Sequence, residues 1–316
     1  MLRHVRNLAV AGALLFPFGC ARGQGEAARR AGAAQPAPVT QEIDWAAVDQ
    51  AFGRKGQMME GGVYRFGMPR SDLAVTSQGV RVRPALSLGS WIAFKPSGGG
   101  QIVAMGDLVL TEAEYNRVIA RLQQGGVGQT AIHKHLLEES PAVWWTHVHA
   151  RGNPVEIART VRAALALSGT PSAAPAPPAS QEPFGLDTAE LRGTLGYAGR
   201  INGGVYQVNV PRAETIRSMG VEVPPTMGTG TAINFQPTDG GKAAINGDFV
   251  MTAGEVDPVI GALRANGIQV VALHNHMLDD EPRLFFMHFW ANDDAVKLAR
   301  GLRVALDRTN VKKPVP

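Results

Sequence analysis

The sequence predicts an α+β protein made of two tandem homologous domains related by a pseudo-two-fold. Short motifs recur at a nearly constant offset, apolar residues alternate in strand-like runs, and capping patterns precede apolar periodic segments. The motif 61–64 (GGVY) returns at 203–206, an offset of 142, and Gly106-Asp107 returns as Gly247-Asp248, an offset of 141. This period is far too long for a solenoid repeat. It therefore indicates a duplicated domain.

The first elements expected in each copy are a short helix and several strands. In the first copy they are the helix 45–52 and the strands 63–68, 80–82, 91–94 and 102–110. The capping-box pattern from Thr111 to Glu114, repeated from Thr252 to Glu255, then predicts helices 112–123 and 254–266. A strand, a turn, a strand and a final helix (154–167 or 293–307) follow. The second half of each copy is thus β-α-β-β-α, with an antiparallel or mixed sheet.

The N-terminus has the pattern of a secretory signal. Arg3 and Arg6 form a basic region, and the apolar run 8–18 is too short to span a bilayer before the only cysteine, Cys20. The position of Cys20 suggests lipidation and a membrane anchor, although Pro17 departs from the lipoprotein pattern, and simple cleavage nearby is the alternative. We expect export to the periplasm or outer membrane. The expected organisation is signal peptide 1–20, flexible tether 21–42, repeat domain 43–168, Ala/Pro linker 169–183, repeat domain 184–310 and tail 311–316.

Composition argues against two classes of partner. The formal net charge of +4 includes Arg3 and Arg6, which would leave with the signal, and the rest of the chain has no dense basic run. Nucleic-acid binding therefore has no electrostatic support. The sequence also lacks a phosphate-binding loop, so no nucleotide cofactor is expected.

The histidines are the clearest functional signal in the duplicated sequence. Seven of the eight histidines lie in two windows of the same layout, and histidine is the commonest metal ligand. Residues two apart on a strand share a face. A hairpin around Pro141 would set His133 opposite His149 and His135 opposite His147, and one around Pro282 would set His276 opposite His288 and His274 opposite Trp290. The predicted ligands of zinc or another divalent transition metal are His133, His135, His147, His149, His274, His276 and His288.

The surrounding residues give weaker indications. Carboxylates in the two turns could complete or orient a metal site; they are Glu138, Glu139, Asp279 and Asp280. Asp107 and Asp248 are expected to close turns rather than to bind a ligand. By ligand count, the first cluster resembles a closed structural site and the second, with three histidines, an open catalytic one.

The second histidine window and its surroundings resemble a known family. The segments 247–252 (GDFVMT), 274–278 (HNHML), 281–290 (EPRLFFMHFW) and 295–302 (AVKLARGL) are similar to the LppY/LpqO family of bacterial lipoproteins. The resemblance extends over both copies, roughly residues 43–310. This family has no known function, so the resemblance implies an exported, duplicated domain but no activity. The spacing His133-x-His135 with Glu139 also imitates a cupin ligand motif, but the expected glycine is missing and a cupin barrel would lack the predicted helices.

Three functions remain open from the sequence. The first is an exported envelope protein that binds a divalent metal. The second is a metal-dependent enzyme acting on a small molecule or an envelope substrate. The third is an envelope interaction or ligand-binding protein whose histidines form a polar, pH-sensitive or structural cluster without metal.

Overall fold

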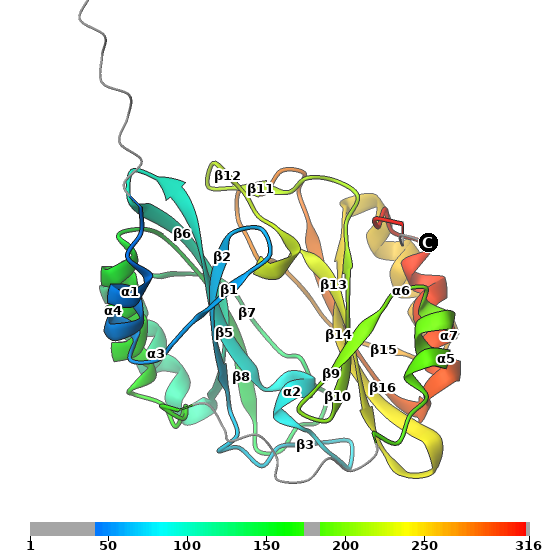
Figure 1. Ribbon diagram of the computed structural model, residues 1–316. Helices are drawn as coiled ribbons and strands as arrows, with labels where there is room; N and C mark the ends of the chain where they lie inside the picture. Colours follow the sequence, from blue (N-terminus) through cyan, green and yellow to red (C-terminus); the bar gives the residue numbers. More distant parts are fainter. Residues whose placement is uncertain (1–41, 174–183, 314–316) are drawn as a thin grey trace, which may run out of the picture. The chain divides into compact units, whose positions relative to one another are not determined.

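The computed structural model describes residues 42–173 and 184–313, which belong to one compact unit extending from residue 40 to the C-terminus (Figure 1). The expected signal peptide, Cys20 and nearly all of the tether lie outside the described residues, as does most of the linker. Among the helices of the described residues, none combines the length and apolar character that crossing a membrane requires.

The first repeat contains four α-helices and eight strands within the described residues. The capping box from Thr111 to Glu114 begins α3 as predicted, and Val118 and Leu122 form its buried face. The helices are α1 (Trp45–Phe52), α2 (Pro84–Ser87), α3 (Glu112–Gln124) and α4 (Pro154–Leu165). The strands are β1 (Gln57–Met59), β2 (Val63–Pro69), β3 (Thr76–Ser77), β4 (Val80–Arg81), β5 (Gly89–Gly98), β6 (Gln101–Thr111), β7 (Gly128–His133) and β8 (Val143–Gly152).

The second repeat follows the same order of strands. Here the capping box of Thr252 and Glu255 begins a 3-10 turn that leads into the α-helix. The helices are α5 (Thr188–Leu195), η1 (Pro225–Met227), η2 (Asp239–Gly241), η3 (Ala253–Glu255), α6 (Val256–Ala265) and α7 (Ala295–Leu306). The strands are β9 (Gly199–Asn202), β10 (Val205–Pro211), β11 (Arg217–Ser218), β12 (Val221–Glu222), β13 (Gly230–Pro237), β14 (Lys242–Met251), β15 (Gln269–His274) and β16 (Phe285–Asp294).

The two repeats have the same sheet topology. The first sheet has the order β1-β2-β5-β6-β8-β7, and the second has the equivalent order β9-β10-β13-β14-β16-β15. Every neighbouring pair in both sheets is antiparallel. The predicted α+β class with two homologous domains is therefore confirmed, and so is the β-α-β-β-α order, seen as β6-α3-β7-β8-α4 and β14-α6-β15-β16-α7.

Each sheet has one face covered by its own helices. Figure 1 shows α1, α3 and α4 on one face of the first sheet, and α5, α6 and α7 on the corresponding face of the second. Two apolar cores fill these layers, each made of residues from a single repeat. The long strands β6 and β14 are buried on both faces along nearly their whole length. A strand with both faces buried at the centre of a sheet requires a second layer on the other side.

That second layer is the other repeat. Two further apolar clusters combine residues of both sheets, with Trp145 and Trp290 in one and Val103 and Phe286 in the other. Polar contacts between the repeats are reciprocal. Arg65 donates to the carbonyl of Thr226 (2.8 Å), and the corresponding Gln207 donates to the carbonyl of Ala85 (2.8 Å). The two repeats therefore pack through equivalent surfaces, as a pseudo-two-fold requires.

Candidate metal centre between the repeats

Two aspartates lie at the middle of the buried strands rather than in turns, and the expectation that they close turns is wrong. Asp107 on β6 is directly opposite His147 on β8, and Asp248 on β14 is directly opposite His288 on β16. Side chains that face each other in this way have Cβ atoms about 4.5–5.5 Å apart. Each repeat therefore places one carboxylate beside one imidazole on the sheet face that meets the other repeat.

The His-x-His segments lie at the ends of the edge strands, in a register that differs from the predicted one. His133 is the last residue of β7 and is opposite Trp145, and His274 is the last residue of β15 and is opposite Phe286. The predicted antiparallel pairing of the strands on either side of Pro141 and of Pro282 is confirmed, but the predicted register, which set His133 opposite His149 and His276 opposite His288, is wrong. Residues 134–142 do not form a simple turn, because Ser140 forms a β-bridge with Thr76, the first residue of β3. The shift is by an even number of residues, so it preserves the face on which the histidines lie.

His149 is separated from the other histidines of its window. It is opposite Gly128 on β7 and Met105 on β6, two positions further along β8 than His147. Two residues of a strand span about 6.6 Å. Its ring lies against Gly128, where an added Cβ would be 2.7 Å from Nε2, and it lines a surface pocket with Met219. The predicted four-histidine cluster of the first repeat therefore does not form.

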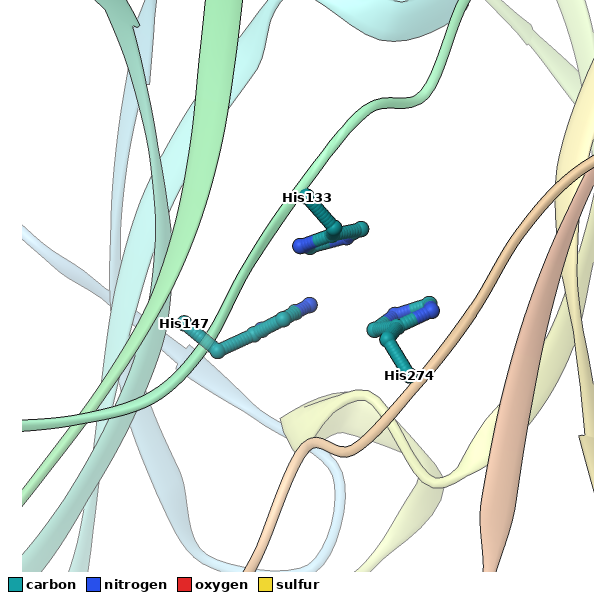
Figure 2. Close-up of side chains that lie close together, drawn as sticks. All are labelled: His133, His147 and His274. Carbon is teal, nitrogen blue, oxygen red and sulfur yellow. The ribbon is translucent and has the colours of Figure 1, made fainter.

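The six remaining histidines converge on one place between the repeats. Figure 2 shows the rings of His133, His147 and His274 close together, although they come from β7, β8 and β15. The ring centroids of His133 and His274 are 3.9 Å apart. The sequence left open whether the two windows form one site or two, and the structure brings six of the seven histidines into a single assembly. Its eight members are between 4 and 9% exposed; we call Asp107, His133, His135, His147, Asp248, His274, His276 and His288 the histidine–aspartate cluster.

The cluster follows the same pseudo-two-fold as the fold. The centroid distance between His135 and His288 is 3.6 Å, and the equivalent distance between His276 and His147 is 3.9 Å. His133 lies 5.1 Å from His288, and His274 lies 5.3 Å from His147. These ring contacts are thus repeated by their symmetry equivalents, whereas the 3.1 Å Nε2 contacts of His133 have no equivalent at His274. This arrangement also joins ligand candidates of one repeat to those of the other.

Backbone carbonyls determine which nitrogen of several rings faces the cluster. Nδ1 of His288 lies 2.8 Å from the carbonyl oxygen of Gly247, and Nδ1 of His147 lies 3.3 Å from that of Gly106. A carbonyl only accepts, so Nδ1 carries the proton and Nε2 has the free lone pair. His276 Nδ1 makes the same kind of contact with Gly228, at 2.9 Å. This is the arrangement in which metal-binding histidines are oriented by their second nitrogen.

Each repeat also fixes the backbone of the other repeat's His-x-His segment. The hydroxyl of Thr130 in the first repeat donates to the carbonyl of His276, at 2.8 Å. The amide of Asn246 in the second repeat donates to the carbonyl of His135, at 2.7 Å. Both side chains are buried. The positions of the rings therefore depend on how the two repeats pack.

Hydrogen bonds within the protein cannot satisfy these rings. Nε2 of His133 lies 3.1 Å from Nε2 of His135 and 3.1 Å from Nε2 of His288. A ring nitrogen of a neutral histidine either donates one proton or accepts one, so at most one of these two contacts can be a hydrogen bond. Further buried atoms have no hydrogen-bond partner among the described residues; they are Asp107 Oδ1, His133 Nδ1, His147 Nε2, Asp248 Oδ1, both ring nitrogens of His274, and His276 Nε2.

Burial sets the protonation of the cluster in the metal-free protein. Burial and the neighbouring imidazoles hold the pKa values of His133, His135, His147 and His274 well below 6.5. Burial lowers the pKa of His288 as well. Burial also raises the pKa of Asp107 to about 8, helped by the charge of Asp248. The approach of Asp107 Oδ2 to His135 Nε2, at 3.4 Å, is therefore a contact with a neutral ring and not an ion pair.

The four carboxylates predicted in the turns interact elsewhere. Glu139 forms an ion pair with Lys134 (2.5 Å), and the amide of Gln78 donates to Glu138 (3.4 Å). Asp279 accepts hydrogen bonds from Ser218 and from the backbone of Met219, and Asp280 accepts from Arg283 and from the backbone of Leu284. These contacts hold the loops in place. The carboxylates that join the cluster, Asp107 and Asp248, are the ones that sequence reasoning assigned to turns, although their repetition was visible.

Four triads in the cluster bring one donor atom from each member within 4.8 Å of the others. Neutral imidazoles and carboxylates are donors that divalent transition metals accept. The cluster can therefore hold metal through nitrogen and oxygen ligands. The triads are His133-His147-His274, His133-His135-His288, Asp107-His135-His147 and Asp248-His274-His276.

Comparison with known proteins identifies the family but no activity. Among curated proteins, none matches the chain. A solved structure, described as "Crystal structure of a trimeric bacterial microcompartment shell protein PduB", is 13% identical to the chain. That match covers 82% of this chain and 96% of the other, with a TM-score of 0.22. Residues 46–167 and 189–308 each match a family model described as "Domain of Unknown Function (DUF1259)". The chain therefore belongs to this family and contains two copies of its domain.

Proposed function

We propose that the chain is an exported protein that binds a divalent transition metal in the histidine–aspartate cluster. The observation that carries the proposal is the distribution of unsatisfied polar atoms. Of the nine buried side-chain nitrogen and oxygen atoms without a partner in the described residues, seven belong to the cluster. Leaving a polar atom buried and unpaired costs about 1–3 kcal/mol. A metal ion accepts the lone pairs that no proton can satisfy here.

The donor set favours some metals over others. Six imidazoles and two carboxylates supply nitrogen and oxygen ligands, a set suited to zinc, copper, nickel or iron. The neutral state that burial imposes on the histidines is the state that a metal ligand requires. Binding would release the proton that Asp107 holds in the metal-free protein at neutral pH.

Burial favours binding or storage over catalysis on a substrate. Catalytic metal sites keep one coordination position open to water or substrate. All eight residues of the cluster are at most 9% exposed. Two surface pockets, one between α1 and α4 and one beside His149, are lined by none of the cluster's residues. A metal-dependent enzyme on a small-molecule or envelope substrate is therefore the less favoured alternative.

The test is metal analysis of the purified protein at neutral pH. After dialysis against zinc and then against metal-free buffer, inductively coupled plasma mass spectrometry should find tightly held metal. The double variant His133→Ala/His274→Ala should lose it, while the His149→Ala variant, changed outside the cluster, should keep it. If the wild-type protein retains no zinc, copper, nickel or iron, the better explanation is the third function considered from the sequence, a ligand-binding or interaction protein whose histidines form a polar cluster without metal.

Export is the second part of the proposal. Its support comes from the basic residues Arg3 and Arg6, the apolar run 8–18 and Cys20, and from the resemblance to LppY/LpqO lipoproteins. We propose that acylated Cys20 anchors the protein to a membrane facing the periplasm. Mass spectrometry of the mature N-terminus should find a lipid-modified Cys20. A free amino terminus downstream of Cys20 would contradict the anchor while leaving export intact.

A further inference from the structure

The number of donors in the cluster exceeds what one ion takes. A structural zinc ion binds four ligands, and the cluster supplies eight. The eight divide into two sets of four with no shared member, and the repeat correspondence exchanges the sets. The first set is Asp107, His133, His135 and His288. The second is Asp248, His274, His276 and His147.

Three members of the first set converge through their Nε2 atoms. His133 Nε2 lies 3.1 Å from Nε2 of both His135 and His288. Ligand atoms on one tetrahedral ion, with bonds of about 2.0–2.1 Å, are roughly 3.3 Å from each other. These two separations are therefore close to the edge of a tetrahedral site. Asp107 Oδ2 lies 3.4 Å from His135 Nε2 but outside this triad, so the carboxylate has to move towards the ion to become the fourth ligand.

The second set is the counterpart of the first under the repeat correspondence, and here the close triad consists of the aspartate and the two histidines of the second repeat, Asp248-His274-His276. Asp248 Oδ2 lies 2.9 Å from His276 Nε2 and 3.8 Å from His274 Nε2. His147 completes the set from the first repeat, with its ring centroid 3.9 Å from that of His276. Its Nδ1 is directed to the carbonyl of Gly106, and its Nε2 is buried without a partner.

The grouping of the donors argues against one central ion. The triad His133-His147-His274 (Figure 2) would be the core of such a site, and it contains neither aspartate. Two other triads, His133-His135-His288 and Asp248-His274-His276, have no member in common. One ion in each of these two triads would use six of the eight donors, whereas one ion in the central triad would use three.

We infer that the cluster holds two metal ions, each bound by three residues of one repeat and by one histidine of the other. The inference rests on the metal-binding function proposed above and adds the number of ions and their ligands. His288 and His147 are the ligands that cross between the repeats. Each ion therefore joins the two repeats, and loss of one crossing histidine affects mainly one ion.

The experiment is a zinc titration of the full chain followed by native mass spectrometry. The wild-type protein should bind two zinc ions. The variants His147→Ala and His288→Ala should each retain one, and the double variant should retain none under the same conditions. The matched control is His149→Ala, which removes the same side chain from the same strand as His147 but outside the cluster; it should still bind two ions. Far-UV circular dichroism shows which variants are folded.

A second measurement, on the wild-type protein, tests the number of ions without relying on the folding of any variant. With two equivalents of Cu²⁺, electron paramagnetic resonance should show magnetic coupling between neighbouring ions. A stoichiometry of one at saturation, with an uncoupled copper spectrum, would overturn the two-ion arrangement and leave metal binding intact. No bound metal at all would overturn the proposed function itself, so the two failures are distinguishable.

Discussion

Replacement of Thr130 by valine should weaken both the fold and the metal centre. Thr130 is 7% exposed, and its hydroxyl donates to the carbonyl of His276 across the interface between the repeats, at 2.8 Å. Valine has nearly the same shape, so the main loss is this one hydrogen bond. A buried carbonyl left unpaired costs about 1–3 kcal/mol, and each kcal/mol lowers Tm by about 2–4 °C in a protein of this size. Thermal unfolding followed by circular dichroism measures the effect in EDTA.

The same change should raise the dissociation constant for zinc about threefold to tenfold. The hydrogen bond from Thr130 holds the backbone of His276 in place, so part of the lost free energy weakens metal binding. A tenfold change corresponds to about 1.4 kcal/mol. The matched control is Thr231→Val, which removes a buried hydroxyl that accepts from the backbone of Val250 within one repeat. It should lower Tm without weakening zinc binding as strongly. Equal effects of both substitutions on zinc affinity, or an unchanged Tm for Thr130→Val, would refute the role of this contact.

Two other perturbations test the electrostatics and the packing of the cluster. In EDTA, urea unfolding between pH 5 and 9 should give the greatest free energy of unfolding near pH 7. At lower pH the unfolded state binds more protons at the five cluster histidines whose folded pKa values are lowered, and this outweighs the opposite effect of Asp107. At higher pH those histidines are neutral in both states, and the folded state alone keeps the proton of Asp107 up to its pKa of about 8, so the free energy of unfolding falls. A flat profile would contradict the burial of these groups. The variant Gly106→Ala should have a lower Tm and a lower zinc affinity, because the added Cβ would lie 2.5 Å from the carbonyl oxygen of Trp91. The control Gly67→Ala should retain zinc affinity, because the added Cβ would have nothing within 4 Å. Equal zinc affinities for both variants would show that the carbonyl of Gly106 does not position His147.

The regular elements could be predicted because their signals are local. The helix 45–52 was expected with the bounds that the structure has, and the capping box at Thr111 marked the start of α3. Because the two repeats correspond residue by residue, each helix or strand predicted in one repeat was also predicted at the equivalent position of the other. Hydrophobic periodicity and caps depend on neighbours in sequence, so one sequence contains enough information for them.

The composition of the centre could be predicted only in part, because it depends on contacts distant in sequence. The offset that relates His133 to His274 is the same whether the two windows form separate sites or one. The register failed because the loop after β7 forms a β-bridge to Thr76, and no local pattern specifies that contact. Asp107 was assigned to a turn, where aspartate is common. A carboxylate in a strand buried on both faces departs from that local rule, and such departures are expected at functional sites.

The division of the donors between the repeats has a consequence for how metal loading depends on protein concentration. A single repeat contains only half of the cluster, so an isolated copy could assemble it only by pairing with a second molecule. That association would be bimolecular, and dilution would release the ions. Joining both copies in one polypeptide makes the encounter intramolecular, with an effective concentration of the order of millimolar. The duplication also allows the halves to differ, as they do where His149 in one corresponds to the buried Trp290 in the other.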